Sequence, residues 1–478
     1  MAKTNEIIGR TREQDMLERC VNSNKPELIA VYGRRRVGKT FLIKQYFHDD
    51  FDFYISGIYG VSNAEQLERF AYQLSTFAKK YTQKPKNWFE AFDMLKAYLT
   101  ECNKQKIIIF IDELPWFDTP KSNFIRALES FWNMWASNRN NIKMIVCGSS
   151  TTWIINKLLG DKGGLHNRVT CRIYLKPFSL AETEQFVKKR KIKWNRALIL
   201  QCYMALGGIP YYWEMLDSQQ SPLQNIDRLF FEDNAALRME YDFMMRSLFN
   251  DSVSYQRVIA TLSKKMKGMT RQEILNALKI SDNGTITTIL ENLCNCDIIR
   301  KYSSYGKRQR DVMYQLTDMY SLFYLRFVKD NNTQNPHFFA EMKDQQRSTW
   351  YGYAFEQVCL RHVEQLKHAI GISGVSCNVC SWSKRADEDT SGTQIDLLIE
   401  RADGIINICE MKYSNKKYEL TSAYRKTLEE RISIFREATD TDSTVQLTMV
   451  TTHGLKENKN SFIINSQVKI DDLFWQRN

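Results

Sequence analysis

The chain has 478 residues, of which 43% are hydrophobic and 26% are charged. This balance is typical of folded globular proteins and excludes a largely disordered chain. The N-terminus lacks the apolar stretch of a signal peptide and no apolar run could cross a bilayer, so we expect a cytoplasmic protein without a membrane partner.

The length of the chain indicates how many domains it has, and its charge indicates which partners it could bind. One hydrophobic core stops growing well below this length, which predicts two to four domains. The eleven cysteines are an odd number and are scattered along the chain, so reduced thiols are expected. The net charge of +12 is compatible with an anionic partner such as DNA, and equally with a solvated basic surface that binds nothing in particular.

The first predicted elements are a strand, a loop and a helix between residues 27 and 47. The loop GRRRVGKT matches the pattern GxxxxGK[ST], in which backbone N–H groups and the helix N-terminus face phosphate oxygens. We expect Lys39 to reach the β and γ phosphates of ATP and Thr40 to bind Mg²⁺. The whole loop is predicted to contact the nucleotide through Gly33, Arg34, Arg35, Arg36, Val37, Gly38, Lys39 and Thr40.

A second apolar strand at 106–112 ends in two carboxylates, Asp112 and Glu113. In a parallel sheet, ligands bind at the carboxyl ends of such buried strands. Asp112 is therefore predicted to hold Mg²⁺ beside the nucleotide, and Glu113 to polarise the attacking water as a catalytic residue. The alternative is a strand followed by a solvated acidic turn.

The third predicted strand, within residues 142–150, ends in two serines and is followed by two arginines at 168 and 172. Each of these side chains has two interpretations. Ser149 or Ser150 could sense the γ-phosphate or cap the following helix. Arg168 or Arg172 could act as an arginine finger, within one chain or on a neighbouring subunit of a homo-oligomer. Either arginine could instead pair with a surface carboxylate.

Four separated motifs carry a family resemblance over roughly the first half of the chain. GRRRVGKT, FIDELPW, GGLHNRVTCRIYLKPFSL and GGIPYYW occur in this order. Together they resemble the archaeal-type ATPase family of P-loop proteins, which is similar to the AAA+ and STAND groups. The resemblance implies an α/β ATPase core of the ASCE type at 1–178, with an extra strand between the P-loop and Walker B strands. It also implies a helical lid at 179–245, in which the paired glycines at 207 and 208 mark a tightly packed turn.

The pattern of residues 246–330 predicts a winged helix. Short amphipathic segments indicate three helices, the second of which begins with a capping box of Thr270 and Glu273. Two strand-like runs joined by a basic loop then indicate a wing. Such a module can bind DNA or can pack between domains. In the DNA-binding role the contacts would come from Thr285, Thr287, Thr288 and Asn292 of the third helix and from Lys307, Arg308 and Arg310 of the wing.

Residues 337–478 follow an Asn-rich linker and are predicted to form a separate α/β domain. Two apolar strands are joined there by a turn at 401–404. Asp396 lies within the first strand, whereas Glu410 and Lys412 end the second on one face. Two carboxylates and a lysine so placed can bind Mg²⁺ and hydrolyse a phosphodiester.

This D…ExK pattern resembles the PD-(D/E)xK nuclease superfamily, although the initial Pro is absent. Glu356, on a helix predicted at 350–363, resembles the helical Glu of such nucleases. The resemblance implies metal binding by Glu356, Asp396 and Glu410 and a catalytic role for Lys412. It also matches the C-terminal domain of unknown function that is commonly fused to archaeal-type ATPases. The acidic residues 387–389 are expected to be solvated.

The combined hypothesis is an ATPase whose nucleotide state controls a winged helix and a nuclease-like domain that act on DNA. The alternative is a STAND-like signalling or scaffold ATPase, whose C-terminal domain binds a partner without catalysis. Both hypotheses share the ATP and Mg²⁺ site of the first half.

Overall fold

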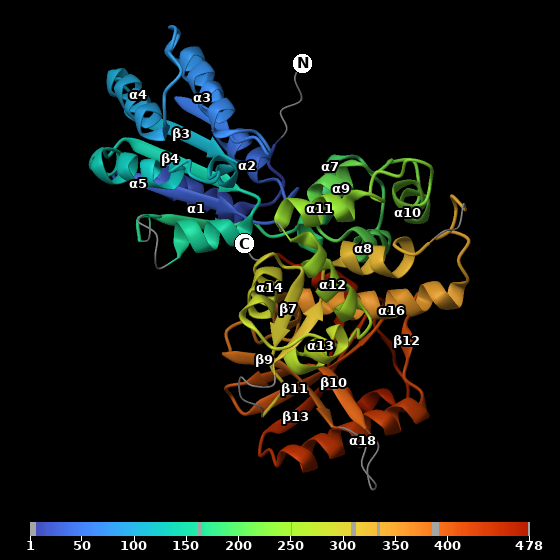
Figure 1. Cartoon of the computed structure of the whole chain (residues 1–478). Helices are drawn as coiled ribbons and strands as arrows, with labels where there is room; N and C mark the ends of the chain where they lie inside the picture. The colour runs from blue at the N-terminus through green and yellow to red at the C-terminus, as the bar shows by residue number, and fades with distance from the viewer. Residues whose placement is uncertain are drawn as a thin grey trace. The chain divides into compact units, whose positions relative to one another are not determined.

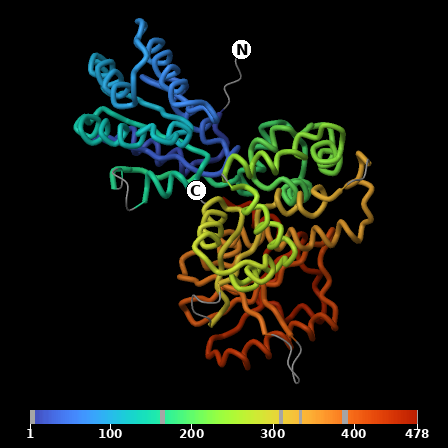
Figure 2. The backbone as a smooth tube through the Cα atoms, in the orientation of Figure 1, coloured from blue at the N-terminus to red at the C-terminus, as the bar shows by residue number. Residues whose placement is uncertain are grey.

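The computed structural model describes residues 6–160, 165, 167–249, 251–306, 312–331, 335–384 and 392–476. Their backbone can be followed in Figure 2. They belong to two compact units, Met1–Pro177 with Met244–Asn250 and Phe178–Phe243 with Asp251–Asn478. Among the described residues, no helix is both long and apolar enough to cross a membrane.

The first unit is built on a five-stranded parallel sheet (Figure 1). Its strands are β1 (Glu27–Tyr32), β2 (Phe53–Ser56), β3 (Ile107–Asp112), β4 (Ile142–Gly148) and β5 (Cys171–Tyr174). The order β2-β3-β4-β1-β5 places β4 between β1 and β3, as the family resemblance implies. Nearly every residue of these three strands is buried, because helices cover both faces of a parallel sheet.

Helices and one large hydrophobic cluster hold this sheet in place. Residues of α3, α4 and α5 share that cluster with residues of β1 to β4, so these helices cover one face. Helix α1 contacts β1 and β5. The helices are α1 (Thr11–Asn22), α2 (Lys39–Tyr46), α3 (Asn63–Ala78), α4 (Trp88–Glu101), α5 (Phe124–Met134) and α6 (Thr151–Trp153), which continues as a π-helical segment (Ile154–Leu159).

The second unit begins with the helices predicted to form a lid: α7 (Leu180–Lys189), α8 (Arg196–Leu206), α9 (Pro210–Glu214), α10 (Pro222–Phe230) and α11 (Glu240–Leu248), which runs into the first unit. The turn between α8 and α9 is tightly packed, as predicted. Gly207 has a φ of 63°, and a Cβ on Gly208 would lie 2.0 Å from the carbonyl oxygen of Phe178. Only glycine fits at position 208.

A middle module, defined as residues 252–316, contains three helices and a small antiparallel sheet. Its elements are α12 (Ser252–Ser263), β6 (Met269–Thr270), α13 (Arg271–Leu278), α14 (Gly284–Asn295), β7 (Ile299–Tyr302) and β8 (Met313–Leu316). The predicted capping box of Thr270 and Glu273 at the start of α13 is confirmed. The predicted wing residues Lys307, Arg308 and Arg310 lie outside the described residues. After β8 come α15 (Met319–Phe323) and a π-helical segment (Tyr324–Val328).

The C-terminal module, defined as residues 344–473, has a mixed five-stranded sheet of order β15-β13-β11-β10-β9. The hairpin of β10 and β11 turns at Gly404, whose φ is 80°, where the sequence predicts it. The strands are β9 (Cys377–Lys384), β10 (Thr393–Arg401), β11 (Ile405–Lys412), β13 (Thr444–Thr451) and β15 (Ser466–Lys469), with β12 (Tyr418–Glu419) and β14 (Leu455–Lys456) paired separately. The helices are α16 (Asp344–Arg361), α17 (Val363–Ala369), α18 (Ser422–Thr439) and α19 (Ile470–Leu473). The acidic residues Asp387, Glu388 and Asp389 lie outside the described residues.

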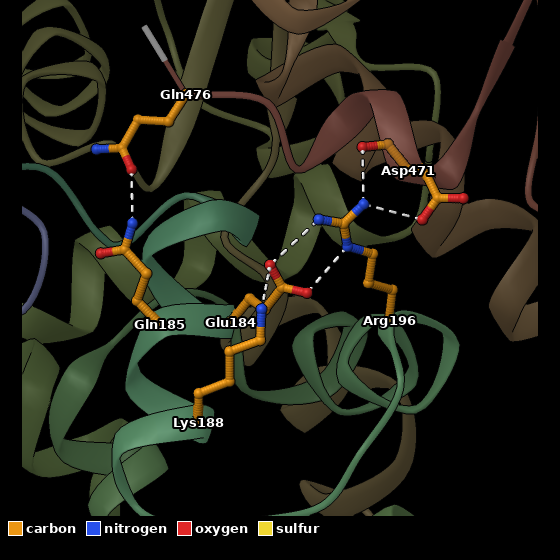
Figure 3. Close-up of polar contacts among 6 residues, drawn as sticks. All are labelled: Glu184, Gln185, Lys188, Arg196, Asp471 and Gln476. Atoms are coloured by element: carbon orange, nitrogen blue, oxygen red, sulfur yellow. Dashed lines mark hydrogen bonds and ion pairs between the residues drawn. The ribbon is translucent and has the colours of Figure 1, made fainter. Parts of the chain in front are cut away.

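Polar contacts tie the lid helices to the C-terminal module within this second unit (Figure 3). Arg196 of α8 pairs with Glu184 of α7 at 2.9 Å and with Asp471 of α19 at 3.0 Å. In addition, the imidazole Nε2 of buried His362, after α16, accepts a hydrogen bond from the N–H of Leu180 at 3.2 Å. An ion pair and a hydrogen bond therefore connect the lid helices to the C-terminal module.

Candidate functional site

The loop between β1 and α2 folds around the ammonium group of Lys39, the first residue of α2. The side chain of Lys39 is buried, and its Nζ donates to the carbonyl oxygens of Gly33 and Arg34, both at 2.9 Å. Gly33 and Gly38 have φ angles of 148° and 92°, and a Cβ on Gly33 would lie 2.3 Å from the oxygen of Leu175. Loop N–H groups, a helix N-terminus and an ammonium in one place can hold a phosphate chain.

The other residues of this loop lie in different surroundings. Arg34 is buried, with Nη2 3.0 Å from Sδ of Met244, whereas Arg35 is exposed. Arg36 adopts a left-handed backbone with φ of 68°. Val37 is buried, and its carbonyl oxygen accepts a hydrogen bond at 3.2 Å from buried Arg10. Arg10 was not predicted from the sequence, where it stands only as a charged residue directly before the segment that forms α1.

The structure brings together the two residues predicted to bind Mg²⁺ beside this loop. Oγ1 of Thr40 donates to Oδ2 of Asp112 at 2.8 Å, across 72 positions of sequence. Asp112 is buried at the end of β3. A hydroxyl and a carboxylate are hard oxygen donors of the kind that Mg²⁺ prefers, so these residues fit the ion.

Glu113 is held by Ser149 rather than lying free. Its Oε2 accepts hydrogen bonds from the backbone N–H of Ser149 at 3.1 Å and from the hydroxyl of the same residue at 2.9 Å. Ser149 is the residue predicted either to sense the γ-phosphate or to cap a helix, and here it binds the neighbouring carboxylate. Ser150 occupies the N-cap position of α6, but its side chain makes no capping hydrogen bond.

The two candidate finger residues are both exposed. Arg168 lies in the loop before β5, and Arg172 lies within β5. Burial raises the pKa of Tyr32, at the end of β1, and the charge of Arg172 opposes this rise. The role of Arg168 as a finger stays a prediction.

In the middle module, two of the four residues predicted to enter a DNA groove are engaged elsewhere. Thr287 accepts a hydrogen bond from Arg271 at 2.8 Å, and Asn292 donates one to the hydroxyl of Tyr255 at 2.6 Å. Thr285 and Thr288 are exposed. Thr287 and Asn292 are partly exposed.

In the second unit, Glu356 of α16 and Asp396 of β10 line one cavity of about 290 Å³. Burial raises the pKa of Glu356 to about 7, and repulsion from Asp396 contributes to the rise while Lys412 opposes it. Oδ1 of Asp396 accepts a hydrogen bond from Nε2 of Gln394 at 2.7 Å. A carboxyl with a pKa near neutrality can exchange a proton with water under ordinary conditions.

Glu410 contributes to the raised pKa of Glu356, but its own oxygens are engaged by cations. Its carboxylate pairs with Lys412 at 2.9 Å and accepts hydrogen bonds from Arg431 and from the hydroxyl of Tyr424. Burial acts to raise the pKa of Glu410, but Lys412 and Arg431 lower it below its ordinary value. Although burial opposes it, Glu410 raises the pKa of Lys412.

The metal set predicted from the sequence is therefore not assembled in this structure. Within the described part of the chain, no group of three or more His, Cys, Asp or Glu side chains could hold a metal ion. The physical reason is that the partly buried cations Lys412 and Arg431 compensate the charge of Glu410 and keep its oxygens occupied. Tyr424 and Arg431 were not predicted from the sequence, where their spacing of seven residues, which places them on one face of α18, was the available signal.

Comparison with known proteins shows that the first half of the chain is similar to ATPase domains. Residues 8–216 match a family described as an ATPase domain predominantly from Archaea. An uncharacterized protein of Methanocaldococcus jannaschii is 24% identical over 397 residues, which cover 80% of this chain and 83% of that protein. An uncharacterized ATP-binding protein of the same organism is 55% identical over 40 residues, 8% of this chain and 68% of that protein. A solved Walker-type ATPase of Pyrococcus abyssi is 18% identical with a TM-score of 0.49, over 67% of this chain and 96% of that chain.

Proposed function

We propose that the chain, whose residues 8–216 match an ATPase domain predominantly from Archaea, hydrolyses ATP at residues 33–40 and uses the nucleotide state to control a nuclease-like domain at 337–478. The single observation that carries the ATPase assignment is the hydrogen bond between Thr40 of the loop and Asp112 of β3. It joins two elements that the chemistry of phosphate transfer requires side by side.

In this proposal each residue of the ATP site has one task. The ammonium of Lys39 exchanges its two loop carbonyls for phosphate oxygens, and the left-handed glycines let the loop N–H groups face the same ligand. Thr40 and Asp112 hold Mg²⁺, which when bound neutralises charge on the phosphates. Glu113 orients the attacking water once its carboxylate has released the hydroxyl of Ser149. The hydrogen bond between Glu113 and Ser149 therefore belongs to the state without nucleotide.

The nuclease-like assignment is supported by the cavity that Glu356 and Asp396 line together. Their oxygens suit Mg²⁺, which when bound would supply an activated water and charge neutralisation for phosphodiester hydrolysis. Glu410 can join Glu356 and Asp396 as a metal ligand only when it gives up its ion pairs with Lys412 and Arg431. Lys412 would then stabilise the charge on the phosphate.

A second function is favoured by the same contacts of Glu410. A carboxylate already neutralised by two cations needs no metal. This observation fits a signalling or scaffold ATPase whose C-terminal module binds a partner without cleaving DNA.

Experiments on the purified chain distinguish the two proposals. ATP turnover should disappear in Lys39→Ala. With Mg²⁺ and ATP, cleavage of single-stranded and duplex DNA should be lost in Asp396→Asn while ATP turnover remains. If no DNA is cleaved by the wild type, or if Asp396→Asn cleaves as well as the wild type, the nuclease half is refuted and the scaffold role stands. If Lys39→Ala hydrolyses ATP normally, the ATPase site is wrong.

A further inference from the structure

The cavity beside Glu356 and Asp396 is built by two modules of the second unit. Helix α16 and strand β10 of the C-terminal module supply the carboxylates. The middle module supplies basic and polar side chains, among them Lys267, Arg300 and Gln315. Sequence reasoning assigned none of these three residues a role, because they precede the nuclease-like pattern by roughly 100 positions.

Arg300 is positioned by its neighbours on the middle-module sheet. Its Nε donates to Oε1 of Gln315 at 2.7 Å, and Nε2 of buried Gln315 donates in turn to the carbonyl oxygen of Met266 at 2.7 Å. The guanidinium lies over the ring of Tyr302, 4.4 Å from its centroid. Arg300 is thus fixed in orientation, and its charge interacts favourably with Asp396.

The two modules are joined by backbone pairing next to this cavity. Ser304, just after β7, forms a parallel bridge with Ser381 of the edge strand β9. The N–H of Tyr305 donates to the oxygen of Ser381 at 2.7 Å, and the ring of Tyr305 packs on Phe435 with centroids 5.2 Å apart. This joint ties the chain just after β7 to the C-terminal sheet, and Arg300 of β7 lines the same cavity as Asp396.

A buried amide in the cavity wall indicates a ligand with hydrogen-bond donors. Gln357 is 1% exposed, lines the cavity, and its Oε1 has no hydrogen-bond partner among the described residues. Leaving a buried acceptor unpaired is costly, so such a group calls for a donor from outside the chain.

The size and charge of the cavity restrict which ligands can bind there. At about 290 Å³, the cavity lies at the lower end of the roughly 300–1,000 Å³ of small-molecule sites. A B-form duplex, whose major groove alone is about 12 Å wide, does not fit. A single nucleotide does, and it carries both a phosphate for a guanidinium fork and sugar or base donors for an amide oxygen.

We propose that this cavity binds the unpaired end of a DNA strand, with Arg300 contacting its phosphate and Gln357 accepting a hydrogen bond from its sugar or base. The inference rests on the proposed nuclease-like function and deepens it by naming the substrate class. Arg300 is then a residue of the substrate site supplied by the middle module, whose role in DNA contact is through β7 rather than through α14.

The test is DNA binding by the full chain in EDTA, where no metal-dependent cleavage occurs. Fluorescence anisotropy would compare a ten-nucleotide single strand with a free 5′-phosphate, a blunt duplex of the same sequence, and a mononucleotide as competitor. The variants are Arg300→Ala, Arg300→Lys and the matched control Lys301→Ala, which removes an exposed charge from the next position of β7. Thermal unfolding of each variant checks that it folds.

The single strand should bind more tightly than the duplex. Arg300→Ala should weaken this binding by about 10- to 100-fold, the scale of a lost charge-assisted pair, and Arg300→Lys by less. Lys301→Ala should stay within about twofold of the wild type. Competition by the mononucleotide as strong as by the strand would identify a free nucleotide as the ligand and overturn the strand-end proposal.

Two further outcomes separate this inference from the nuclease proposal. Equal binding by Arg300→Ala and Lys301→Ala, or a preference for the duplex, overturns the inference even if Asp396→Asn abolishes cleavage. Strand binding that depends on Arg300 without any cleavage in Mg²⁺ upholds the inference and refutes the nuclease activity.

Discussion

Replacing Glu410 by Ala is expected to destabilise the second unit strongly. The carboxylate is 12% exposed and accepts from Lys412, Arg431 and Tyr424, with the two cations 32% and 18% exposed. Removing it leaves both cations without this partner in partly buried surroundings, a loss of about 3–5 kcal/mol for fully buried pairs. Because Lys412 keeps some access to water, we expect the lower end, about 3 kcal/mol.

Thermal unfolding of the full chain measures this loss. For a unit that spans Phe178–Phe243 and Asp251–Asn478, an unfolding entropy of about 2.1 cal/mol/K per residue turns a loss of about 3 kcal/mol into a fall in the melting temperature of roughly 5 °C. The matched control is Asp396→Ala, which removes a carboxylate that repels Glu356 and attracts Arg300, so that the two effects oppose each other and the melting temperature should fall by less than in Glu410→Ala. If Glu410→Ala melts within about 2 °C of the wild type, or if Asp396→Ala melts as low, the reasoning is refuted.

Three other predictions follow from single contacts. Glu113→Gln should keep ATP binding by calorimetry but slow hydrolysis by about 100-fold or more, whereas Lys39→Ala should lose binding. Gly208→Ala places a Cβ 2.0 Å from a backbone oxygen and should lower the unfolding free energy by about 2 kcal/mol or more, unlike Gly284→Ala, where a Cβ meets nothing within 4 Å. Burial lowers the pKa of His362 from 6.5 to about 4. Its neutral form therefore stabilises the fold fully above pH 6.5, and up to about 3 kcal/mol is lost as the pH falls towards 4. Unfolding followed from pH 7 to pH 4 should show a shallower loss in His362→Gln. Normal turnover in Glu113→Gln, equal melting of the two glycine variants, or an unchanged pH dependence in His362→Gln would contradict the respective contact.

The ATP site could be predicted from the sequence because its geometry follows from local patterns and one sheet rule. The glycines at 33 and 38 stand where the backbone needs left-handed or otherwise restricted angles. Thr40 and Asp112 are 72 positions apart, yet each ends or follows a buried parallel strand, and such ends meet at one edge of the sheet. The sequence therefore contained the information for their proximity.

The surroundings of the acidic residues could not be predicted in the same way. Glu410 lies at the expected end of its strand, but Tyr424 and Arg431 reach it from a helix whose packing no local pattern specifies. Likewise, Ser149 binds Glu113 because the ends of β3 and β4 meet, and a hydroxyl alone does not reveal which neighbour it takes. Side-chain pairing depends on tertiary distances, which spacing along the chain does not give.

Arg300 illustrates the largest gap between sequence and structure. Its strand was predicted as part of a wing, where basic residues are expected to meet DNA phosphates from outside. The structure instead turns this strand towards Asp396, 96 positions later, through a backbone joint at Ser381 that has no sequence signature. Isolated bridges between modules are set by the packing of complete domains.

The proposed function rests on one claim, that the nucleotide state of the P-loop controls what the rest of the chain does with DNA. The most direct measurement is the affinity of Glu113→Gln for single-stranded DNA with saturating ATP and with saturating ADP. We predict affinities that differ by at least about fivefold, the lower end of typical allosteric coupling, and no difference in Lys39→Ala. Equal affinities with ATP and ADP in Glu113→Gln would contradict the claim.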